Sequence, residues 1–70
     1  MALTRLQVID VLLGAEDDLA RAREELTTAV VRRLEGWEDP EARVTEARQR
    51  VRLATGAVNA ALDQALAKAL

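Results

Sequence analysis

Hydrophobic residues recur every three or four positions along most of this chain, a spacing that is typical of α-helices and not of strands. A first regular row consists of Val8, Leu12, Ala15, Leu19, Ala22, Leu26 and Ala29. A second row consists of Val44, Ala47, Val51, Ala54, Val58, Ala61 and Ala65. The pattern predicts an all-α chain with one helix over about residues 4–35 and another over about 40–69.

The stretch between the rows, residues 36–39, carries the signals of a turn. Gly36 suits the left-handed conformation that commonly ends a helix. Asp39 can cap the next helix, and Pro40 fits its first turn, where a missing N–H costs nothing. Trp37 has two interpretations: it packs back onto the preceding turn near Val31, or it anchors a partner protein.

Two glycines interrupt helix propensity inside the rows, because an interior glycine costs about 1 kcal/mol relative to alanine. Gly14 either ends a short first helix, with Glu16 opening the next, or lies within one continuous helix. The row passes Gly14 without a change of phase, which favours the continuous helix. At Gly56 we expect at most a gentle bend. Thr4 is expected to cap the first helix, but no acid stands three residues later to complete a capping box.

The two rows also predict how the helices pair. In an antiparallel hairpin with a short turn, facing residues have numbers with a constant sum. Three alanines in each row recur every seventh residue and pair with sums of 76, which places the turn at residue 38. These alanines are Ala15, Ala22, Ala29, Ala47, Ala54 and Ala61. Small residues at this spacing allow close helix packing, and the pattern resembles the antiparallel coiled-coil pairs known as Alacoils.

A chain of 70 residues rarely builds a core that contributes more than about 3–5 kcal/mol of stability by itself. It contains no cysteine and no histidine, so neither a disulfide nor a structural zinc site can supply additional stability. Association with another protein remains as the source of stability. We therefore expect the hairpin to assemble into a larger helical bundle.

Large apolar residues outside the rows lie towards the two termini, which an antiparallel turn brings together at the open end of the hairpin. We predict that this end is a partner interface formed by Leu3, Leu6, Ile9, Leu13, Leu62 and Leu66. Contiguous exposed apolar surface usually marks an interface. The alternative is that the termini fray and that these are ordinary surface leucines.

The charged residues are concentrated elsewhere, since 18 of the 22 lie between Glu16 and Arg52. Helical spacing predicts ion pairs of Asp17 with Arg21, Arg21 with Glu25, and Glu46 with Arg50. The arginines here have two interpretations, a solvated face of mixed charge or a surface that binds phosphates. A possible second contact surface consists of Trp37, Arg48, Arg50 and Arg52. Interleaved acids, a net charge of −2 and the lack of stacking aromatics disfavour nucleic acid.

Catalytic chemistry has few candidates in this sequence. Serine, cysteine, histidine and tyrosine are all absent, so the usual nucleophiles and bases are missing. No glycine-rich phosphate loop occurs. We therefore expect no enzyme activity, no cofactor and no metal.

Neither terminus has the pattern of a targeting or membrane segment. The N-terminal stretch has polar residues inside its apolar part and no basic region before it, so it does not fit a signal peptide. The apolar C-terminal run is shorter than the roughly 20 residues of a membrane span. We expect a cytoplasmic protein or a component of an assembled particle.

Together these patterns predict a structural or assembly subunit that associates with copies of itself or docks into a larger protein particle, for example a phage virion, through its open end. The alternative is a small regulatory protein that binds a target protein through Trp37 or nucleic acid through the arginines.

Overall fold

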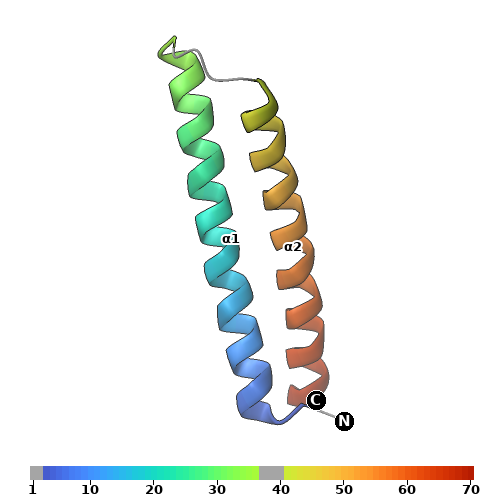
Figure 1. Cartoon of the computed structure of the whole chain (residues 1–70). Helices are drawn as coiled ribbons and strands as arrows, with labels where there is room; N and C mark the ends of the chain where they lie inside the picture. The colour runs from blue at the N-terminus through green and yellow to red at the C-terminus, as the bar shows by residue number, and fades with distance from the viewer. Residues whose placement is uncertain (1–2, 37–40) are drawn as a thin grey trace.

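The computed structural model describes residues 3–36 and 41–70, which form two long helices (Figure 1). Helix α1 spans Arg5–Leu34 and helix α2 spans Glu41–Ala69. They run antiparallel, with the start of α1 and the end of α2 at one end of the molecule (Figure 1). The rod measures 49 × 17 × 14 Å, as expected for helices of about thirty residues that rise 1.5 Å per residue. The predicted helical hairpin is confirmed.

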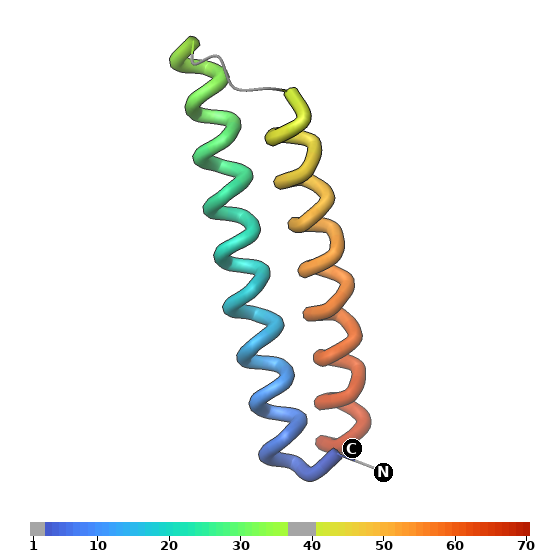
Figure 2. The backbone as a smooth tube through the Cα atoms, viewed as in Figure 1, coloured from blue at the N-terminus to red at the C-terminus, as the bar shows by residue number. Residues whose placement is uncertain are grey.

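The helices lie side by side along their whole length (Figure 2) and meet along a narrow seam. Every residue of both predicted rows is buried or partly buried. Six of these residues are buried and form the core, which consists of alanine, valine and leucine: Val8, Leu19, Ala22, Ala47, Val58 and Ala61. An interface between only two helices cannot bury many more residues, because each helix turns only one stripe of residues towards its neighbour.

Specific contacts fix the register of the two helices. Arg50 of α2 donates a hydrogen bond to Glu25 of α1, with 3.0 Å between Nη1 and Oε2. Ala29 and Ala47 line one surface hollow between the helices, and Ala22 and Ala54 line another. The numbers of Arg50 and Glu25 have a sum of 75, within one residue of the predicted sum of 76, and the alanines expected to pair share the same hollows.

Helix α1 begins with a complete capping box, contrary to the expectation from the sequence. The backbone N–H of Gln7 donates to Oγ1 of Thr4 at 3.2 Å, and the N–H of Thr4 donates to Oε1 of Gln7 at 2.9 Å. The expectation of an incomplete box was wrong because a glutamine amide oxygen accepts this hydrogen bond as a carboxylate does.

The end of α1 follows the predicted glycine signal. Gly36 has φ +86°, and its N–H donates to the carbonyl oxygen of Arg33 at 3.1 Å, as in a Schellman cap. The predicted roles of Trp37, Asp39 and Pro40 concern positions outside the described residues. Helix α1 continues through Gly14 without interruption, as the phase of the row favoured.

Candidate docking surface

The residues predicted to contact a partner are mostly exposed large hydrophobic side chains. Leu6 and Leu13 are 75% and 62% exposed, and Leu66 is 58% exposed. Ile9 and Leu62 are exposed to a smaller degree. Leu3 precedes α1 and is partly buried, so it contributes less free surface than its neighbours.

The helical phase places the five exposed residues relative to the seam. With seam residues at heptad positions a and d, the residues beside them fall at e and b on one flank and at g and c on the other. Leu6, Ile9 and Leu13 occupy b, e and b on α1, whereas Leu62 and Leu66 occupy e and b on α2. All five are therefore on the e/b flank of their own helix.

The ion pair of Glu25 with Arg50, one of the contacts between the helices, shows that these two flanks share one face of the hairpin. Glu25 and Arg50 both occupy g positions and contact each other across the seam. The g flanks of the two helices thus lie on one face, so their e/b flanks lie together on the other. Leu6, Ile9, Leu13, Leu62 and Leu66 form a single surface, which we call the apolar patch.

Other exposed hydrophobic residues are more scattered. Leu34, at 82% exposed, lies near the turn with the partly covered Val30 and Val31. Leu53, at 66% exposed, occupies a c position in the middle of α2, on the face opposite the patch. Outside the open end, the described residues show no apolar group of comparable size on one face.

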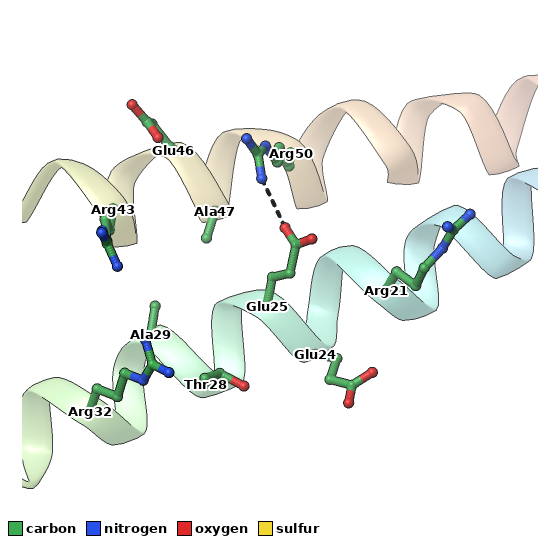
Figure 3. A pocket seen from close by; sticks show the side chains of 10 residues that line it. All are labelled: Arg21, Glu24, Glu25, Thr28, Ala29, Arg32, Arg43, Glu46, Ala47 and Arg50. Carbon is green, nitrogen blue, oxygen red and sulfur yellow. Dashed lines mark hydrogen bonds and ion pairs between the residues drawn. The ribbon is translucent and has the colours of Figure 1, made fainter. Parts of the chain in front are cut away.

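The face opposite the patch carries mixed charge around a shallow hollow of about 540 Å³ (Figure 3). Arg50 reaches from α2 to Glu25 on α1, whereas the side chain of Glu46 points away from α1 (Figure 3). Four arginines and three glutamates are mixed around this hollow, so it has no uniform sign that would select an anion or a cation. It fits the solvated-face interpretation better than a phosphate site.

The ion pairs follow the predicted spacing only in part. Arg21 contacts Asp17 at 3.6 Å, as predicted, and lies closer to Asp18, at 2.7 Å. The expected pairs of Arg21 with Glu25 and of Glu46 with Arg50 are replaced by the contact between the helices, which uses Glu25 and Arg50 together.

The predicted second contact surface is divided between the two faces. Arg50 lies on the charged face, whereas Arg48 and Arg52 occupy e and b positions on the face of the apolar patch. Arg23, at an e position of α1, lies on the same face, and the predicted pairing places it at the level of residue 53. We call Arg23, Arg48 and Arg52 the arginine cluster. Trp37, the fourth member of the predicted surface, lies outside the described residues.

The described residues contain few features of a reactive site. No three carboxylates within residues 3–36 and 41–70 gather closely enough to hold a metal ion. No buried side-chain nitrogen or oxygen in that part of the chain lacks a hydrogen bond. Over their described residues, neither α1 nor α2 is apolar enough to cross a membrane. Searches of family models, curated proteins and solved structures found no match to this chain.

Proposed function

We propose that this chain is a non-enzymatic structural or assembly subunit that associates through the apolar patch. The observation that carries the proposal is that five large aliphatic side chains lie exposed on one face at the open end. Contiguous apolar surface of this kind is rare on monomeric proteins except at interaction sites.

The energetics of a two-helix fold support the same conclusion. The seam buries only small and branched aliphatic residues, and a chain of this size usually needs help from oligomerisation to be stable. At about 25 cal/mol per Å², covering several hundred Å² would contribute several kcal/mol. Folding and association are therefore coupled in this proposal. The simplest partner is another copy of the chain.

The experiment compares two leucine-to-glutamate variants of similar exposure. Leu13 is 62% exposed within the patch, and Leu53 is 66% exposed on the opposite face. Light scattering from about 1 µM to 1 mM, the range where weak complexes dissociate, should show association for the parent and for Leu53→Glu. It should show monomers for Leu13→Glu, because a buried carboxylate without a partner is costly.

Thermal melting provides a second measurement. If folding is coupled to self-association, the melting temperature of the parent rises with protein concentration, and that dependence disappears in Leu13→Glu. A parent chain that is monomeric at all concentrations, and that melts at the same temperature throughout, would contradict self-association.

One observation favours a second candidate function, that of a regulatory protein that binds an anionic partner. The arginine cluster brings three cationic side chains to one face. Within the described residues, no ion pair or hydrogen bond joins their side chains to an acid. An acidic peptide or a nucleic acid is the kind of ligand that would satisfy them.

A further inference from the structure

The face that carries the apolar patch changes character along its length. From the open end it begins with the patch, continues through the polar residues Asn59, Glu16 and Thr55, and reaches the arginine cluster. Arg23 follows Ile9 by two heptads and Arg48 precedes Leu62 by two heptads, a distance of about 21 Å along the rod. Val30 and Leu34 lie beyond the cluster, near the turn.

This order restricts how two copies can pack face to face. If two hairpins lie side by side in the same direction, patch meets patch, but each arginine cluster also lies against the other. Six guanidinium groups would then share one level of the bundle without an acid among them, and like charges in a partly dehydrated interface repel strongly.

In a full-length antiparallel arrangement, apolar residues of the other copy face only part of the apolar patch. On α1 it places Leu6 and Ile9 opposite Leu34 and Val30 of the other copy, which is favourable. On α2, however, it places Leu62 and Leu66 at the level of the other copy's arginines and Thr45. Half of the patch would therefore remain without an apolar counterpart.

A third arrangement brings most of the patch together and keeps the two arginine clusters apart. We propose that a second copy docks open end to open end, about a two-fold axis that crosses α1 between Asp10 and Val11 and α2 near Leu66. Leu66 is then at the level of Leu66 of the other copy, and Ile9 is within one residue of the level of Leu13 of the other copy. Both arginine clusters remain in water outside the overlap. This arrangement rests on the proposed function and specifies the partner and its geometry.

The same axis brings opposite charges together at the edges of the overlap. Glu16 lies as far from the axis on one side as Arg5 lies on the other, so Glu16 of one copy is at the level of Arg5 of the second. Arg5 shares a shallow hollow with Ile9, which places it at the edge of the seam next to the apolar patch. The symmetry produces two such pairs in each dimer.

The apolar area is sufficient for a specific interface of modest size. Five large aliphatic side chains, each between 39% and 75% exposed, offer on the order of 500 Å² per copy. Burial on both copies therefore approaches the roughly 1,000 Å² that a specific interface requires. Such an area is typical of a reversible dimer.

Distance measurement between spin labels distinguishes the three arrangements. The chain has no cysteine, so Ala42→Cys provides a single labelling site, which is exposed and lies at an f position on the back of α2. At 1.5 Å per residue, open-end docking places the two labels about 70 Å apart, and full antiparallel packing about 40 Å apart. Side-by-side packing in one direction places them within about 25 Å.

A distance near 70 Å supports the proposal. Either shorter distance overturns the open-end geometry and leaves self-association in place. If the labelled chain shows no distance between labels and remains monomeric, both the geometry and the proposed function fail.

Charge reversal tests the same axis independently. Glu16→Arg should weaken the dimer about two- to fivefold, as expected for loss of exposed ion pairs, and addition of Arg5→Glu should restore its affinity. The matched control is Glu24→Arg, the same change at an exposed position on the back of α1, which should alter affinity less. If the double variant binds no better than Glu16→Arg alone, Glu16 and Arg5 are not partners and the axis is wrong.

Discussion

Arg50 and Glu25 are separated by 25 residues in the sequence and joined by a hydrogen bond of 3.0 Å across the two helices. Because both residues occupy positions of the same heptad type, their contact identifies which flanks of α1 and α2 share a face. The five side chains of the apolar patch are assigned to the other face on this basis, and the pair therefore also locates the candidate docking surface.

The pair itself should contribute little to stability. Its side chains are 64% and 55% exposed, and exposed ion pairs typically contribute about 0.2–1 kcal/mol. A double-mutant cycle with Arg50→Gln and Glu25→Gln, measured by denaturant unfolding at one protein concentration, should give a coupling energy in this range. The coupling should decrease as salt is raised. A coupling that does not change with salt would indicate that the contact is not an exposed ion pair.

Replacement of the seam alanines by larger residues should strongly reduce the stability of the hairpin. Ala61 is 3% exposed and Ala22 is 7% exposed, so Ala61→Leu or Ala22→Leu should destabilise the hairpin by about 1–3 kcal/mol through overpacking. The neighbouring exposed residues Ala60 and Ala20 provide matched controls, and leucine there should change the free energy of unfolding by less than about 0.5 kcal/mol. Equal effects at seam and control positions in chemical denaturation would show that the register is wrong.

The same substitution should have opposite effects at two glycines. At both Gly14 and Gly36, an added Cβ atom would meet nothing within 4 Å, so backbone conformation determines the outcome. Gly36→Ala should cost about 1 kcal/mol or more because φ is +86° there. Gly14→Ala should stabilise the helix by roughly 0.5–1 kcal/mol. Thermal unfolding of both variants at one concentration provides the comparison, and two changes of the same sign would contradict it.

Removal of the capping box at the start of α1 should reduce the stability of the hairpin. Thr4→Ala removes the acceptor for the N–H of Gln7 and should reduce stability by about 1 kcal/mol. Thr4→Ser retains the hydroxyl and should remain close to the parent. Helix content by circular dichroism during chemical unfolding measures the difference. Equal losses in the alanine and serine variants would show that the hydroxyl does not act as a cap.

The seam could be predicted from the sequence because small residues that recur every seventh position on both helices can pair in few registers. Ala22 and Ala54 belong together once the turn is placed near residue 38, and this turn was indicated independently by Gly36. The turn signal depends only on Gly36 and its immediate neighbours. It does not require knowledge of what lies across the seam.

Contacts that depend on competition between partners were harder to predict. The spacing of four residues suggested Glu46 for Arg50, but Glu25 on the other helix lies closer because both residues occupy the same flank of the seam. Heptad positions would have indicated this, and they would also have shown that Leu6 and Leu62 share a face. The division of Arg48 from Arg50 follows from the same phase and was missed for the same reason.

The arginine cluster allows the two candidate functions to be distinguished. Arg23, Arg48 and Arg52 lie on one face, but the chain has a net charge of −2 and no aromatic residue in the described ranges that could stack on bases. We therefore expect nucleic acid to bind weakly, without sequence preference and with affinity that falls steeply as salt is raised. Titration of labelled single- and double-stranded oligonucleotides at two salt concentrations measures this directly. Tight, sequence-selective binding at physiological salt that is lost in both Arg48→Glu and Arg52→Glu, but retained in Arg50→Glu on the opposite face, would favour the regulatory function over the assembly subunit.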